Sequence, residues 1–120
     1  MNRENATYVT DVSLVNCIVP VGKADAVLKA ARDLGIGAGV VYRARGIGLR
    51  ERLGLLGIAF EAEKEVVVMI VANERLDLVV DGLYKAAEMN TLAAGFIYTT
   101  QVEKAALYIP EEVLKRLNQT

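Results

Sequence analysis

The sequence contains no histidine, and Cys17 is its one cysteine. Histidine is the commonest general base and a common zinc ligand, so its absence removes most familiar catalytic and zinc sites. A disulfide within the chain is impossible. Cys17 lies in an apolar run, which favours a small buried side chain over a nucleophile. No nucleophile or base with an orienting partner is evident, and we expect the protein not to be an enzyme.

A surplus of one charge is also missing. The chain has 14 Lys and Arg against 15 Asp and Glu, a net charge of −1. Proteins that bind nucleic acids usually carry a basic surplus, so we expect no nucleic-acid partner. No apolar run approaches the roughly 18 residues that cross a bilayer. Residues 1–11 lack the apolar core of a signal peptide, and we expect a cytoplasmic protein.

Hydrophobic residues, by contrast, make up 53% of the 120-residue chain, although aromatic residues contribute only 6%. A chain of this length is the size of one domain, and Val, Leu, Ile and Ala would fill its core. The apolar surplus indicates that some of this surface is buried between subunits. A well-filled core in a monomer is the alternative.

Hydrophobic periodicity predicts one domain over residues 1–120, of the α+β class. We expect a flexible segment at 1–11, strands at 12–19, 40–45, 66–72 and 96–102, a short strand at 105–109, helices at 23–34 and 74–88, and a C-terminal helix within 110–120. This β-α-β-β-α-β order is the ferredoxin-like split βαβ arrangement. Its helices cover one face of a four-stranded antiparallel sheet. The other, apolar face would be buried in a closed oligomer.

Glycine and asparagine mark two expected helix boundaries. Gly35 follows the last periodic residue of the first helix, as a left-handed C-terminal cap does. Asn73 is predicted to cap the start of the second helix. Gly35 and Gly37 are mostly cap and turn residues in this interpretation. A backbone edge that lines a nucleotide cleft is their alternative role.

Arg43 and Arg45 are the strongest candidates for ligand contact. They alternate with Ala44 and therefore point to one face of a strand. They could bind an anion, with Gly46 and Gly48 allowing close approach of the backbone. Exposed or inter-subunit ion pairs are an equally good interpretation. The acidic residues that follow the loop, Glu61, Glu63 and Glu65, favour solvated or ion-paired carboxylates over a hard-metal site.

Several runs resemble the P-II signalling protein family. CIVPVGKADAVLKAA at 17–31 is similar to its first strand and helix, and RARGIG at 43–48 to the Gly-Arg-Gly-x-Gly that closes its second strand. EAEKEVVV at 61–68 resembles the opening of its third strand. NTLAAGFIYTTQVEK at 90–104 resembles its loop before strand four and the Val-Glu-(Arg/Lys) exit. The match covers about residues 13–109 and is spread over several short runs.

The resemblance implies a homotrimer with the sheets lining its centre. It implies that an adenine nucleotide (ATP, ADP or AMP) binds as an effector in clefts between subunits, and that no cofactor is required. Gly95 and Lys104 join the candidate ligand-binding residues on this basis. The mobile loop of the family corresponds to residues 46–63, and it would signal to a membrane transporter or regulatory enzyme, as in nitrogen regulation.

The sequence also departs from the family. Residues 46–63 contain no Tyr or Ser for hydroxyl modification. Phe96 stands where typical members carry a phosphate-binding lysine, and the basic pair after strand four is reduced to Lys104. Weaker triphosphate binding, or a ligand with fewer phosphates, follows from these changes. The alternatives are a structural or assembly module without a nucleotide site and, least favoured, a small enzyme whose acids are Glu61 or Glu63.

Overall fold

A computed structural model describes residues 6–37, 39–46, 62–91, 94–108 and 110–113. Its main body is a four-stranded antiparallel sheet in the order β3-β4-β2-β5. The strands are β2 (Val12–Pro20), β3 (Val40–Gly46), β4 (Ala62–Ala72) and β5 (Phe96–Val102). The first and third strands of the βαββαβ series are therefore central, and the second and fourth are edges. This arrangement confirms the predicted ferredoxin-like fold.

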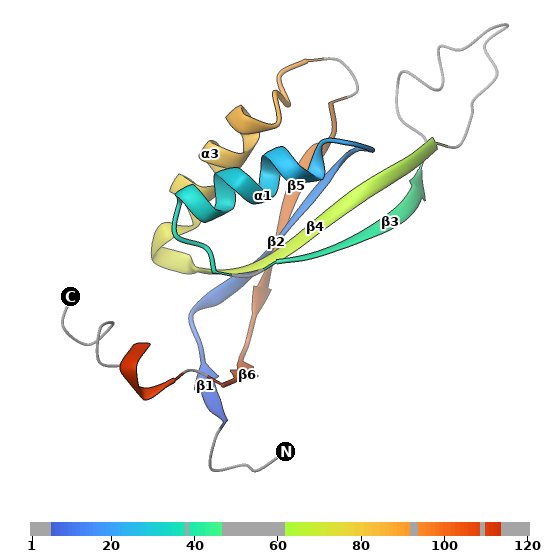
Figure 1. Cartoon of the computed structure of the whole chain (residues 1–120). Helices are drawn as coiled ribbons and strands as arrows, with labels where there is room; N and C mark the ends of the chain where they lie inside the picture. Colours follow the sequence, from blue (N-terminus) through green and yellow to red (C-terminus); the bar gives the residue numbers. More distant parts are fainter. Residues whose placement is uncertain (1–5, 38, 47–61, 92–93, 109, 114–120) are drawn as a thin grey trace, which may run out of the picture.

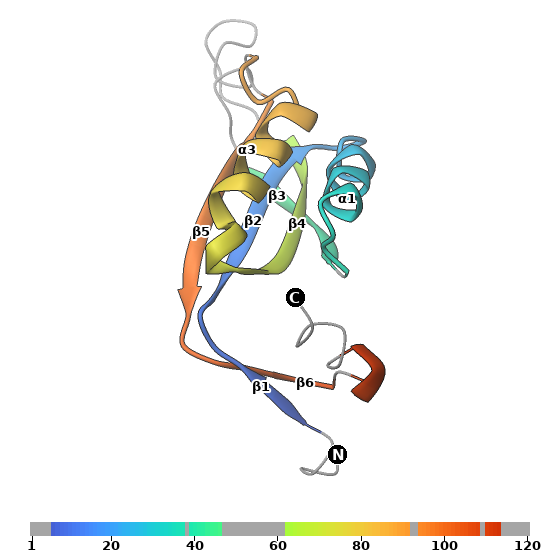
Figure 2. The same cartoon turned by 90° about the vertical axis from the view of Figure 1, so that its left-hand side faces the viewer.

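Helices α1 (Ala24–Asp33) and α3 (Leu76–Ala86) cover one face of this sheet (Figures 1 and 2). The core lies between them and the alternate side chains of the two central strands. Its members are Val15, Cys17, Val19, Ala24, Val27, Ala31, Val67, Met69, Val71, Val79, Leu83, Ala87 and Met89. This dominance of valine and alanine follows from the composition of the chain.

The end of α1 is held by its own cap and by contacts with two residues distant in sequence, Arg75 and Gly82. Gly35 has φ +86°, and the Ile36 N–H donates to the Ala31 carbonyl at 2.9 Å, which confirms the predicted left-handed cap. The Arg75 guanidinium donates to the Leu34 carbonyl. A Cβ on Gly82 would lie 2.9 Å from Leu34 Cδ1, so α1 and α3 meet closely at this point.

Two predicted boundaries are wrong. Strand β4 begins at Ala62, not at residue 66, because its charged first residues still pair with β3. A 3₁₀ turn, η3 (Asn73–Arg75), precedes α3, and the Asn73 side chain caps no helix. It accepts a hydrogen bond from Ser13 Oγ at 2.6 Å and donates one to Asp11 Oδ1 at 2.9 Å. Contacts with the N-terminal segment therefore decide the role of Asn73.

The N-terminal segment contains a strand that the sequence did not predict. β1 (Thr7–Val9) pairs antiparallel with β6 (Ala105–Leu107), and together they form a two-stranded arm that projects from the main sheet (Figure 1). The expectation of a flexible segment is wrong for these residues, because β6 supplies a partner. Asp11, at φ 60°, marks the bend between β1 and β2.

The end of the chain agrees with the sequence as far as it is described. The predicted strand at 105–109 is confirmed through Leu107, and residues 111–113 are helical. The remainder of the predicted C-terminal helix, residues 114–120, lies outside the described residues.

None of the described helices covers the second face of the main sheet, as the sequence predicted. Its exposed apolar side chains come from both edges and from the centre: Val40, Tyr42, Ile70, Phe96 and Tyr98. The Phe96 and Tyr98 rings lie 6.2 Å apart and stack along β5. We call this surface the open sheet face. Soluble monomers rarely expose so large a contiguous apolar patch.

Replacing Gly95 with alanine is expected to destabilise the fold strongly. Gly95 has φ +109°, and a Cβ there would lie 2.0 Å from the Ile18 carbonyl oxygen. We expect Gly95→Ala to lower the free energy of unfolding by more than about 2 kcal/mol, measured by urea denaturation. Gly37→Ala is the matched control, because nothing lies within 4 Å of its Cβ position. Equal stability of the two variants would contradict the backbone clash.

Candidate functional site

The paired ends of β3 and β4 form the root of the loop that connects them. Arg43 lies opposite Glu65, Arg45 opposite Glu63, and Gly46 opposite Ala62. The two arginines therefore share the side of the sheet on which the helices pack, as their alternation predicted. Gly48 and most of the loop 46–63 lie outside the described residues.

The two arginines differ in their partners. Arg43 Nη1 lies 3.1 Å from Glu63 Oε2, diagonally across the strand pair. Both side chains are more than half exposed, so this ion pair contributes little stability. Arg45 is exposed, and it has no ion pair within the described part of the chain. Arg43 thus follows the ion-pair interpretation, whereas Arg45 has a guanidinium that can receive an anion.

Glu65 caps α1. Its carboxylate accepts hydrogen bonds from the Gly22 N–H at 2.5 Å and the Ala24 N–H at 3.3 Å. These amides lie at the positive end of the helix, where a carboxylate is favourable. Glu65 therefore occupies a helix terminus that could otherwise attract a phosphate. Neither Glu63 nor Glu65 belongs to a possible metal-binding group among the described residues, and Glu61 lies outside them.

The candidate residues at the end of the sheet near the loop lie on its two opposite edges. Gly95 packs against Ile18 and Val19, and Val19 lies opposite Glu65, whose other neighbour is Arg43. Gly95 and Arg43 are therefore at one level but on opposite edge strands. Three strand spacings, roughly 14 Å, separate them. Within one chain, Gly95 cannot share a small ligand with the root of the loop.

The remaining candidates lie at the other end. Gly35 and Gly37 precede β3, and Gly35 fits its role as a helix cap with the Arg75 guanidinium 3.2 Å from its Cβ position. Lys104 lies near the arm, with its ammonium 5.5 Å from the centre of the Tyr8 ring. Lys104 follows the end of β5 that pairs with Val12, so the fold places it away from the root of the loop.

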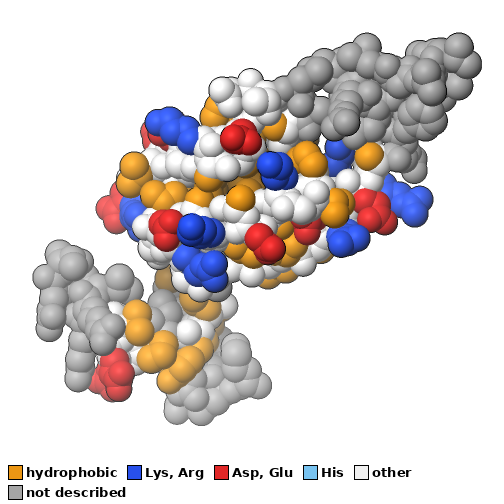
Figure 3. All heavy atoms as spheres, turned by 45° about the horizontal axis from the view of Figure 1, so that its top comes forward, with side chains coloured by type: hydrophobic (Ala, Val, Ile, Leu, Met, Phe, Trp, Pro, Cys, Tyr) orange, Lys and Arg blue, Asp and Glu red, His pale blue; other side chains and the backbone are white. Residues whose placement is uncertain are grey.

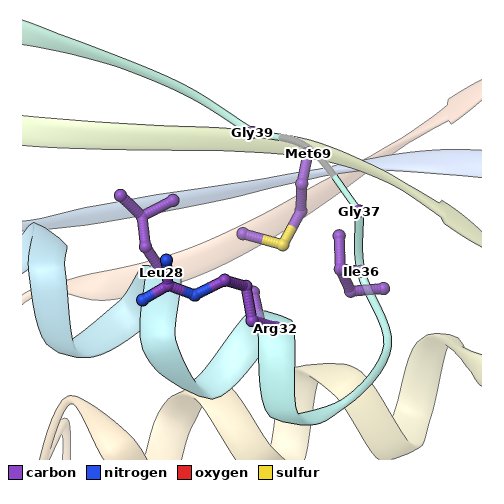
Figure 4. A pocket seen from close by; sticks show the side chains of 7 residues that line it. Leu28, Arg32, Ile36, Gly37, Gly39 and Met69 are labelled. Carbon is purple, nitrogen blue, oxygen red and sulfur yellow. The ribbon is translucent and has the colours of Figure 1, made fainter.

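Gly37 separates two hollows. The smaller, about 130 Å³, lies between α1 and the sheet, where Leu28, Arg32 and Met69 surround it (Figure 4). The larger, about 600 Å³, lies between the open sheet face and the arm, and every side chain that lines it is uncharged. Sequence reasoning missed this larger hollow, because Val9 and Leu107 of the arm form one of its walls. The three-residue strands of the arm are too short to give a periodic signal.

The model of the family described as nitrogen regulatory protein P-II matches residues 12–112. The chain belongs to the P-II family. A search of the curated proteins found no match. Among solved structures, Arabidopsis thaliana PII bound to citrate superposes with a TM-score of 0.63 at 19% identity, covering 78% of this chain and 79% of that chain. This likeness concerns the fold. Strand β1 precedes the residues that the family model matches.

The described surface adds two observations. Lys, Arg, Asp and Glu side chains are interspersed over the face of the main body in Figure 3, without a patch of one sign. Among the described residues, no helix is long and apolar enough to cross a membrane.

Cys17 is expected to be chemically inert in the folded protein. Burial raises the pKa of its thiol from 9.0 to about 12. The thiolate, which is the reactive form, is then roughly 10³-fold scarcer near neutral pH. We expect iodoacetamide to modify urea-unfolded protein readily and native protein at least that much more slowly, as followed by mass spectrometry. Equal reaction rates of native and unfolded protein would contradict this protection of Cys17.

The raised pKa also favours unfolding as the pH rises from about 9 to 12, because the unfolded thiol ionises first.

Proposed function

We propose that this P-II family member is a regulatory protein and not an enzyme. In this proposal residues 1–120 form one domain that assembles as a homotrimer. An adenine nucleotide, ATP, ADP or AMP, binds between subunits. The loop 46–63 then signals the ligand state to a partner protein, either a membrane transporter or a regulatory enzyme. The observation that carries the proposal is the division of the candidate residues between opposite edges of one sheet.

A site between copies resolves this division. Arg45 and Gly46 lie on the edge strand β3, and Gly95 lies at a similar level beside the edge strand β5. A closed ring that places the β3 edge of one copy beside the β5 edge of the next would bring these residues together. Arg45 would supply a cation for a phosphate or carboxylate, and Gly46 would let the backbone approach.

Two further observations support an assembly with a small anionic ligand. The open sheet face carries exposed apolar side chains that a ring with inward-facing sheets would bury. A protein of the same fold, Arabidopsis thaliana PII, has been solved with citrate bound. Citrate therefore belongs among the ligands to be tested. Phe96, in place of a cation, and the engagement of Lys104 with Tyr8 both favour a ligand with few phosphates.

Removing the Arg45 guanidinium is expected to weaken nucleotide binding. A charge-assisted hydrogen bond contributes about 1.5–3 kcal/mol, so Arg45→Ala should raise the Kd at least about tenfold. Titration calorimetry with ATP, ADP, AMP and citrate measures this. Arg43→Ala is the matched control, and we expect a smaller change because Glu63 already engages Arg43. An unchanged Kd for Arg45→Ala would remove the proposed anion contact.

The second candidate function is a structural or assembly module without a nucleotide site. The uncharged lining of the larger hollow favours it, because apolar surface serves assembly better than anion binding. A trimer that gives no heat with any of these ligands at millimolar concentrations would support the module. A monomeric mass by light scattering would overturn both functions.

A further inference from the structure

The arm has two unlike faces. Thr7 lies opposite Leu107 and Tyr8 opposite Ala106, so alternate residues point to opposite sides of the ribbon. Val9 and Leu107 line the larger hollow and form the inner face of the arm. Tyr8 lies on the outer face, beneath the Lys104 ammonium. Hydrophobic side chains dominate the described part of the arm in Figure 3.

The hollow between the inner face and the sheet is unsuited to water. Its volume is about 600 Å³, and aliphatic side chains and glycines line it throughout. These side chains offer water no hydrogen bonds, so an apolar occupant that covers them removes apolar surface from water. Val40 and Ile70 belong both to the hollow and to the open sheet face, so the two surfaces are continuous.

The extent of this surface indicates the kind of occupant. Tyr42, Phe96 and Tyr98 extend it across the sheet, and each is about half exposed. Aromatic side chains present about 150–250 Å² each, so the whole surface reaches several hundred Å². That approaches the roughly 800 Å² per partner of a stable protein interface. A small apolar molecule could fill the hollow but would leave the aromatic side chains exposed.

A second copy of this chain fits these requirements. Its own open sheet face supplies an uncharged apolar surface of the same size. The hollow and the aromatic patch are different parts of one surface, which suits a heterologous contact that closes into a ring.

The junction at the base of the arm keeps the hollow available. Asn73 holds Asp11 through its side chain at 2.9 Å, and the Asn73 N–H donates to the Asp11 carbonyl, also at 2.9 Å. Ser13, which is buried, completes this junction through its hydroxyl. These bonds fix the left-handed bend at Asp11 and hold the arm away from its own sheet. A pre-organised arm loses little conformational entropy when another molecule enters.

We propose that the two-stranded arm is a clamp that holds a second copy of the chain against the open sheet face. This inference rests on the oligomer in the proposed function and assigns an interface to β1, which precedes the P-II match, and to its partner strand β6. The inner face of the arm is buried in the assembly, and the outer face stays in solvent.

Introducing a charge on one face of the arm or on the other tests the clamp. Leu107→Asp places a carboxylate on the inner face, and Ala106→Asp places one on the outer face of the same strand. Sedimentation velocity over a dilution series should show trimers for the parent and for Ala106→Asp. Leu107→Asp should dissociate at a concentration at least about tenfold higher, because its interface would bury an unpaired charge. Circular dichroism checks that both variants are folded.

The outcomes separate the clamp from the trimer itself. A trimer of Leu107→Asp with the parent's affinity would overturn the clamp and leave the proposed function standing. A monomeric parent would overturn both. If Leu107→Asp is unfolded, Leu107→Trp decides, since the chain has no other tryptophan. Its emission should shift to longer wavelength on dilution through dissociation, and an unshifted emission would overturn the clamp. Dye binding gives a further check. If the parent trimer binds a hydrophobic dye, and Leu107→Asp abolishes that binding while remaining a trimer, the clamp is overturned.

Discussion

The sheet of this protein has two apolar faces, and its own helices cover only one. Val67 and Met69 show how this arises, because they point to the helices while their neighbours Val66 and Val68 point to the other side. A strand with a continuous run of β-branched residues has no polar side to present to water. The need to cover the second face explains why so many features of the chain concern its surface and its edges.

Within the main sheet, charged side chains lie only where the apolar pairing of the strands ends. At the root of the loop, β4 continues past the core, and its apolar run gives way to the consecutive charged residues Glu63, Lys64 and Glu65, which pair with β3. Glu65 closes the start of α1, and Glu63 engages Arg43. Each carboxylate has a local structural role, and the guanidinium of Arg45 is left exposed. Specific recognition at this end of the molecule therefore depends on few groups.

The sequence was sufficient to predict those parts of the fold that local patterns encode. Apolar periodicity located α1 and the central strands, and Gly35 marked the end of the first helix. It failed where a distant partner decides the structure. Asn73 has the sequence context of a helix cap, but Asp11 and Ser13 recruit its side chain. Thr7–Val9 has no pattern of its own and becomes a strand because β6 is available. The same limit applied to the site, since alternation placed Arg43 and Arg45 on one face but could not show which of them Glu63 would engage.

The positions of the edge strands connect ligand binding to assembly. If a ligand contacts Arg45 of one copy and the backbone near Gly95 of the next, it binds the assembled form and not the separate chains. Binding then stabilises the assembly by mass action, and the assembly strengthens binding by the same factor. An interface that buries the open sheet face and the inner face of the arm would be strong enough to persist without ligand. In that case the ligand has little influence on the oligomeric state, and its free energy is available to order the loop whose root it contacts. The large apolar surface and the small charged root would then serve separate purposes, the first permanent association and the second a reversible response.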